Sequence, residues 1–201
     1  MIFMNRKLLL ISVFFLSNCS IVSYSEVIPL AKLAIIGADD IEITSEVIEA
    51  KKFSFAKVKI GRSAIAIFSL VKIDQNGSYM WISGEGEILT TFNGKIIKLQ
   101  NSLFNTEFIS FSDFNLDNIK DGDEIQYDVM LYNPQAFVTQ DASIQSFSTN
   151  NNLRIIESVK TNGFKWSYQN EYLYNDRMRA IYARQIIHPK VPEIEINFYY
   201  K

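Results

Sequence analysis

The central part of the chain, residues 63–98, alternates short apolar runs with turn-forming pairs. Asn76-Gly77 and Asn93-Gly94 each lie between two runs of β-branched, aliphatic or aromatic residues. Asn-Gly favours a tight hairpin, because both residues accept the positive φ of a type I′ turn. A Gly-x-Gly sequence at 84–86 indicates a bulge or tight bend between them. This segment therefore predicts a meander of four strands.

The same period-two pattern recurs along the rest of the chain. Residues 124–132 and 193–200 alternate cleanly between apolar and polar side chains, which is typical of half-buried strands. Further strand candidates are residues 51–60, 137–147, 153–159, 164–168, 171–174 and 180–187, with a third Asn-Gly pair at 162–163. Residues 99–123 have poor periodicity and are expected to form a loop with one short turn or helix near 112–119.

Helical spacing is confined to the N-terminal part. A short helix is expected from Ser25, as N-cap, to the residue before Gly37, and a second one begins at Thr44. The fold class expected is mainly β: an antiparallel meander of roughly ten strands, closed as a barrel or packed as a sandwich, with one or two short N-terminal helices.

Composition limits the function classes. The 201 residues contain 48% hydrophobic and 13% aromatic residues, which is enough for one domain with a real core. The net charge is −2, and a weakly acidic chain does not suit a nucleic-acid backbone, which rewards basic patches. The single cysteine allows neither an internal disulfide nor a cysteine-based zinc site.

Residues 1–18 resemble an export signal. Arg6 and Lys7 precede an apolar run, residues 8–16, that is too short to span a bilayer. The following sequence, residues 16–19, ends in Cys19 and resembles the bacterial lipobox. That resemblance implies cleavage before Cys19 and acylation of its sulfur, which makes a stable membrane anchor because each buried CH₂ adds about 0.8 kcal/mol. The domain organisation expected is a signal peptide at 1–18, a tether at 19–24 and a single periplasmic domain at 25–201.

Three sequence features together are similar to one known family. They are the lipobox at Cys19, the segment from Trp81 to Lys98 with its Asn93-Gly94-Lys95 turn, and the sequence Arg184-Gln185 with the prolines that follow. In these features the chain resembles the YjbF/GfcB family of group 4 capsule polysaccharide lipoproteins. The resemblance implies a periplasm-facing outer-membrane lipoprotein that serves capsule or exopolysaccharide production. No catalytic residues come with the resemblance, and we expect neither a metal nor a cofactor.

Candidate catalytic groups are few. His188 is the only histidine, so a catalytic triad or a histidine-based zinc site would have to use it, but a structural position at a strand end is favoured. Glu85 lies within the Gly-x-Gly bend and Glu87 directly follows it. Alternate strand residues share a face, so these two could supply the carboxylate pair of a glycosidase, although acidic residues are ordinary at an exposed bend. The acidic residues at 117–124 lack the ligand order of an EF-hand and indicate a solvated loop.

Aromatic residues offer a binding alternative. Trp81, Trp166, Tyr172 and Tyr174 are candidate contacts for a glycan or a partner protein, because exposed aromatic rings supply rigid amphipathic area. The competing interpretation is that they are core residues or cross-strand pairs.

The function expected is that of a non-enzymatic accessory lipoprotein in polysaccharide export or assembly, anchored through Cys19 and contacting export proteins or the glycan. Two alternatives stay open: a scaffolding lipoprotein unrelated to glycan, and a carboxylate-based glycan-modifying enzyme.

Overall fold

The computed structural model describes residues 44–149 and 152–201, and these residues belong to one compact unit, Ala38–Lys201. The expected signal peptide, the tether with Cys19 and the helix before Gly37 lie outside the described residues. The second expected helix is confirmed as α3 (Ser45–Ala50), in which the amide of Ile48 donates to the carbonyl of Thr44 at 3.1 Å.

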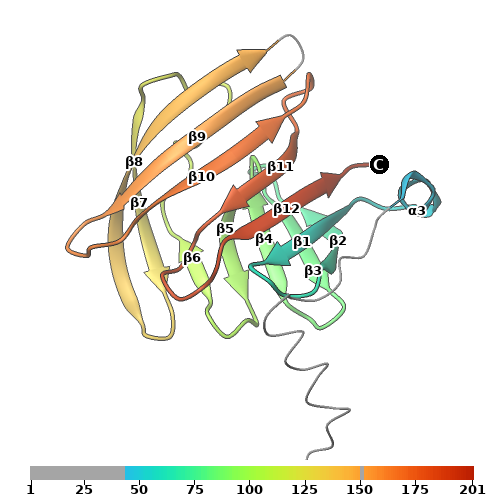
Figure 1. Cartoon of the computed structure of the whole chain (residues 1–201), viewed down its shortest axis with the longest axis horizontal. Coiled ribbons are helices and arrows are strands. Elements are labelled where there is room, and N and C mark those ends of the chain that lie inside the picture. Colours follow the sequence, from blue (N-terminus) through green and yellow to red (C-terminus); the bar gives the residue numbers. More distant parts are fainter. Residues whose placement is uncertain (1–43, 150–151) are drawn as a thin grey trace, which may run out of the picture. The chain divides into compact units, whose positions relative to one another are not determined.

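The rest of this unit is an antiparallel barrel (Figure 1). Each strand pairs with the next one in sequence, and β1 pairs with β12 to close the sheet. Within the described ranges the strands are β1 (Phe55–Ile60), β2 (Ala66–Ile73), β3 (Tyr79–Ser83), β4 (Ile88–Phe92), β5 (Lys95–Gln100), β6 (Thr106–Phe108), β7 (Glu124–Leu131), β8 (Ala136–Thr149), β9 (Asn152–Thr161), β10 (Ser167–Tyr174), β11 (Ala180–Gln185) and β12 (Ile194–Tyr199).

The barrel confirms the expected meander and refines two of its parts. The expected strand candidates at 164–168 and 171–174 form one continuous strand, β10. The expected loop at 99–123 contains a short strand, β6, which pairs with β5 and β7. β6 has only three residues, so its sequence is too short to show an alternating pattern.

The Asn-Gly turns differ in geometry. At Asn93-Gly94 both residues have positive φ, 49° and 81°, as a type I′ turn requires. At the other two pairs only the glycine does, with φ of 83° at Gly77 and 78° at Gly163. In the hairpin at Asn76-Gly77, the Asp74 amide donates a hydrogen bond to the Ser78 carbonyl at 2.8 Å. Its loop is therefore longer than two residues, and the type I′ prediction holds only at Asn93-Gly94.

The interior of the barrel is filled by inward-facing residues from all sides. On β7 the alternation expected from the sequence is confirmed, with Ile125, Tyr127, Val129 and Leu131 buried. Phe114, from the β6–β7 connection, is fully buried and packs against Tyr172 with ring centroids 4.9 Å apart. This connection therefore covers part of the core that the strands alone leave open.

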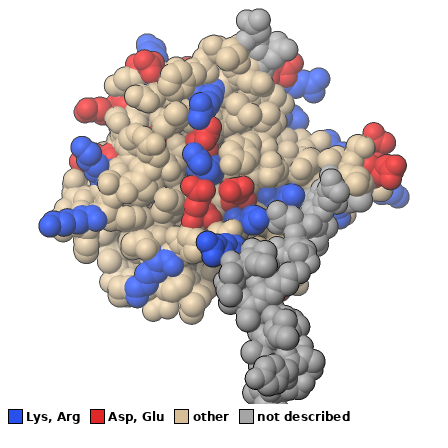
Figure 2. Space-filling model, viewed as in Figure 1, with Lys and Arg blue, Asp and Glu red and all other residues tan. Residues whose placement is uncertain are grey.

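The outer face of β9–β12 carries a row of ion pairs. Arg154 and Arg184 both contact the carboxylate of Glu171, at 2.6 and 3.0 Å, and Arg184 also lies 3.8 Å from Glu193. Figure 2 shows basic and acidic side chains next to one another across this face. Exposed pairs contribute only about 0–1 kcal/mol each, so this row adds modestly to strand pairing.

Among the described residues, no helix has the length and apolar character needed to cross a membrane.

Candidate functional site

A buried ion pair lies inside the barrel. The Lys95 ammonium contacts both carboxylate oxygens of Glu157 at 2.8 Å, and both side chains are almost completely buried. Oε2 of Glu157 also accepts hydrogen bonds from Asn170 Nδ2 at 2.8 Å and from the Tyr172 hydroxyl at 2.9 Å. The Tyr127 hydroxyl is buried without a hydrogen bond of standard geometry, and its ring centroid lies 4.2 Å from the ammonium.

The surroundings keep this pair charged. Burial alone would raise the pKa of Glu157, but the Lys95 ammonium and the hydrogen bonds donated to the carboxylate bring it below its ordinary value. Burial lowers the pKa of Lys95, and Glu157 opposes that shift. The pair has no access to solvent, so it cannot meet a substrate and we assign it a structural role.

The segments that resemble the family converge on this interior. Gln185 of β11 accepts a hydrogen bond from the Ile96 amide and donates one to the Gly94 carbonyl, both at 2.8 Å. A side chain added at Gly94 would lie 2.6 Å from Ala180 Cβ, so only glycine fits there. The Asn-Gly-Lys turn and the Arg-Gln sequence therefore build the core between β5 and β11.

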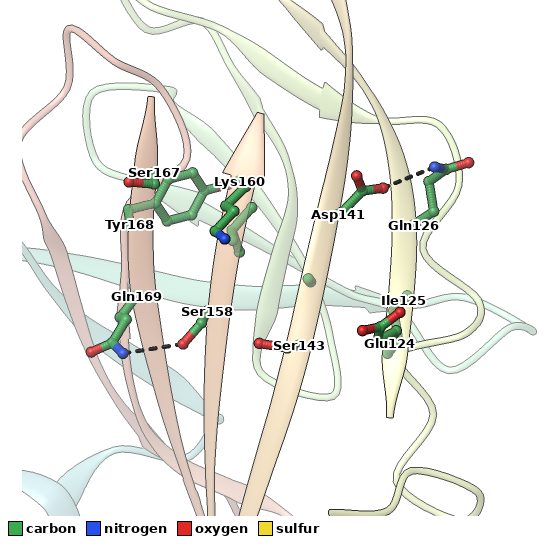
Figure 3. A pocket seen from close by; sticks show the side chains of 12 residues that line it. Glu124, Ile125, Gln126, Asp141, Ser143, Ser158, Lys160, Ser167, Tyr168 and Gln169 are labelled. Carbon is green, nitrogen blue, oxygen red and sulfur yellow. Dashed lines mark hydrogen bonds between the residues drawn. The ribbon is translucent and has the colours of Figure 1, made fainter. Parts of the chain in front are cut away.

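A hollow of about 940 Å³ lies on the outer face of β7–β10 (Figure 3), and we call it the polar hollow after its exposed side chains; Ile125, Ala142, Val159 and Tyr168 also contribute to its lining. The strand register aligns its exposed side chains in two rows that each cross all four strands. Because alternate residues of a strand share one face, every member of both rows points outward. The first row is Gln126, Asp141, Lys160 and Ser167, and the second is Glu124, Ser143, Ser158 and Gln169.

These side chains make few hydrogen bonds with one another. Gln126 donates to Asp141 at 2.9 Å, and Gln169 donates to Ser158 at 3.1 Å, as Figure 3 shows. Hydrogen bonds from Gln126 and Asn162 lower the pKa of Asp141, so this carboxylate is ionised at neutral pH. The hollow thus combines hydroxyl, amide, carboxylate and ammonium groups, which suit a ligand rich in hydroxyl groups.

The aromatic residues considered from sequence divide into two groups. Trp81, Tyr172 and Tyr174 are fully buried in the core, where a ligand on the surface cannot reach them. Trp81 Nε1 donates to Thr91 Oγ1 at 2.9 Å, so its polar atom is satisfied inside the barrel. Trp166 is half-buried, with its ring 4.7 Å from that of Tyr168. A glycan contact through Trp166 stays a prediction, and the other three act as core residues.

The candidate catalytic residues lie in two different connections of the barrel. Glu85 lies in the β3–β4 turn and Glu87 directly before β4, while His188 is buried in the β11–β12 connection. Asp121 and Asp123 accept backbone hydrogen bonds from Ser146 and Lys120. In the described part of the chain no three His, Cys, Asp or Glu residues are grouped as a metal site.

Sequence reasoning missed both the hollow and the buried ion pair. One signal was present on β10, where Tyr168, Tyr172 and Tyr174 alternate with Gln169 and Glu171. This phase places the tyrosines inside and the polar residues outside. No local signal pairs Lys95 with Glu157, because 62 positions separate them.

Comparisons with known proteins agree with this fold. A crystal structure of the hypothetical lipoprotein YmcC from Escherichia coli (K12) is similar, with a TM-score of 0.69 and 17% sequence identity over 89% of this chain and 96% of that chain. No curated protein sequence gives a significant match. The family model described as group 4 capsule polysaccharide lipoprotein gfcB, YjbF matches residues 30–198. The chain therefore belongs to the YjbF family of group 4 capsule polysaccharide lipoproteins.

Proposed function

We propose that this protein is a lipid-anchored accessory factor in capsule or exopolysaccharide production or export, and that it binds the glycan through the polar hollow on β7–β10. The observation that carries the proposal is the alignment of two polar rows across four strands. Membership of a capsule polysaccharide family supports glycan as the ligand class.

The dimensions of the hollow fit an extended chain. Neighbouring strands lie about 4.8 Å apart, so a row across four strands extends roughly 14 Å, and alternate residues on one strand lie about 7 Å apart. A surface of that length, with hydrogen-bonding groups at regular intervals, can contact successive sugar residues. Because each protein–ligand hydrogen bond adds about 1 kcal/mol, several together give useful affinity without a deep pocket.

We also propose that the protein is anchored by acylated Cys19 in the outer membrane and faces the periplasm, as the lipobox-like sequence supports. We propose binding rather than catalysis. The buried Lys95–Glu157 pair is sealed from solvent and so offers no catalytic group to a substrate, which leaves Glu85 and Glu87 as the carboxylates to test. Replacing Glu85 and Glu87 by Gln tests the enzymatic alternative. Full complementation of a deletion strain by that variant would exclude catalysis by this pair.

Polymer binding tests the site directly. Purified surface polysaccharide from the producing strain is titrated into the native protein and into a K160A/Q169A double variant. Two lost contacts of about 1 kcal/mol each predict roughly thirtyfold weaker binding. The matched control is K57A/Q100A, which removes the same residue types from β1 and β5, outside the hollow.

Gene deletion tests the role in the cell. We expect less surface polysaccharide in the deletion strain and restoration by the native gene. Unchanged polysaccharide would favour the scaffolding alternative and would contradict the proposed role.

A further inference from the structure

A second cavity lies at one end of the barrel. It has a volume of about 200 Å³ and its lining is mostly apolar, formed by residues from β7, β8 and β9 and from the β7–β8, β9–β10 and β11–β12 connections. Phe164, which also lines it, is 59% exposed and borders solvent. Pockets that bury drug-sized ligands measure about 300–1,000 Å³. This cavity therefore suits one small unit rather than a length of polymer.

His188 lines this cavity and is only 1% exposed. Its Nδ1 accepts a hydrogen bond from the Lys190 amide at 3.1 Å, so the proton of the neutral ring lies on Nε2. Burial lowers the pKa of His188, which keeps the ring neutral at pH 7. Nε2 has no hydrogen-bond partner of standard geometry among the described residues, and a nearby acceptor, the Tyr132 carbonyl, accepts only a poorly aligned hydrogen bond that partly offsets the lowering of the pKa.

A buried donor left without any partner costs about 1–3 kcal/mol, and a well-aligned ligand acceptor would recover the part of that cost that the Tyr132 carbonyl leaves. An alkyl chain would fill the apolar space but give Nε2 no better acceptor. An unsubstituted sugar would bury hydroxyl groups against apolar walls, each at a similar cost. An acetyl group has one methyl, which fits apolar residues such as Ala136 and Val138, and one carbonyl, which accepts a single hydrogen bond.

We propose that this cavity binds the acetyl group of an acetylated sugar, with the carbonyl accepting a hydrogen bond from His188 Nε2 and the methyl packing among Ala136 and Val138. Trp166 also lines the cavity, and its ring offers a face for the attached sugar. This inference rests on the proposed glycan-binding function and adds a preference for acetylated units within the polymer.

The imidazole signals of His188 give a direct test. His188 is the only histidine in the chain, so nitrogen-15 NMR of the full-length labelled protein reports on this ring alone. N-acetylglucosamine should shift the Nε2 signal, whereas glucosamine and glucose at the same concentration should leave it in place. No shift with the acetylated sugar, or an equal shift with glucose, would overturn the proposal.

Variants separate this cavity from the outer hollow. Ala136→Leu fills the cavity and should weaken N-acetylglucosamine binding at least tenfold, whereas Ala64→Leu, at an exposed loop position, should not. His188→Phe keeps a ring beside Phe104, 5.1 Å away in the native chain, but removes the donor and should have the same effect as Ala136→Leu. If polymer binding depends on Lys160 and Gln169 while the His188 signals do not respond, the acetyl site is refuted and the proposed function stands.

Discussion

Replacing Lys95 by Met tests whether the interior of the barrel depends on its ion pair. The variant keeps most of the side-chain volume but leaves Glu157 with neutral donors alone, among them Asn170 and Tyr172 at 2.8 and 2.9 Å. Removing one partner of a buried ion pair costs about 3–5 kcal/mol. Since a domain has about 5–15 kcal/mol of stability in total, the K95M protein should unfold at a much lower urea concentration.

The contribution of Glu157 to stability should depend on pH with opposite sign in the native chain and in K95M. In the native chain the pKa of Glu157 is lowered, so its contribution is present above the unfolded pKa of about 4.3 and is lost as the pH falls through the folded value. In K95M the ammonium no longer opposes burial and only the neutral hydrogen-bond donors do, so the folded pKa of Glu157 should rise above about 4.3. The contribution is then fully present below about 4.3 and is lost as the pH rises through the folded value. The stability deficit of K95M should therefore shrink between pH 7 and pH 5.

Urea unfolding followed by tryptophan fluorescence at both pH values measures these effects. The E157Q variant should also lose about 3–5 kcal/mol, because it leaves the buried ammonium without a counter-charge. The K95M/E157L double variant buries no charge and should recover much of the loss. Losses below about 1 kcal/mol in both single variants, or a double variant as unstable as their sum, would refute this account of the core.

Three further predictions concern single positions. Gly94→Ala should lower the free energy of unfolding by more than about 3 kcal/mol, because the new Cβ would meet the side chain of Ala180 at 2.6 Å. The control Gly163→Ala has a similar φ but open space around it, so it should cost only about 1 kcal/mol. Equal losses in the two variants would contradict crowding at Gly94. In thermal unfolding, Trp81→Ala should lower the stability by about 3–5 kcal/mol, and Trp166→Ala should lower it by less. Similar losses in the two variants would contradict the half-buried position of Trp166. Cys19→Ser should move the protein from the membrane to the soluble fraction, and persistent pelleting would disprove lipid anchoring.

The local pattern of the sequence predicted most of the fold. Alternation on residues 124–132 and 193–200 identified β7 and β12 because side-chain direction in a strand changes at every residue. The glycines of the Asn-Gly pairs located three turns because they accept positive φ. The sequence did not predict β6, since its three residues are too few to show an alternation of apolar and polar side chains.

The candidate sites depended on information that is not local. From sequence, Trp81, Trp166, Tyr172 and Tyr174 were equivalent as candidate glycan contacts. The closed sheet buried three of them and left Trp166 at the border of a cavity. A strand has two faces, and the packing of the other strands decides which face becomes the interior.

The sequence by itself therefore determined the class of fold, the order of the strands and the resemblance to the family, because each rests on short-range patterns along the chain. Only the tertiary structure decided that Lys95 meets Glu157 and that two polar rows align across β7–β10. The physical reason is register: closing the barrel fixes how far each strand slides along its neighbour, and a slip of one residue would turn every side chain of that strand to the opposite face.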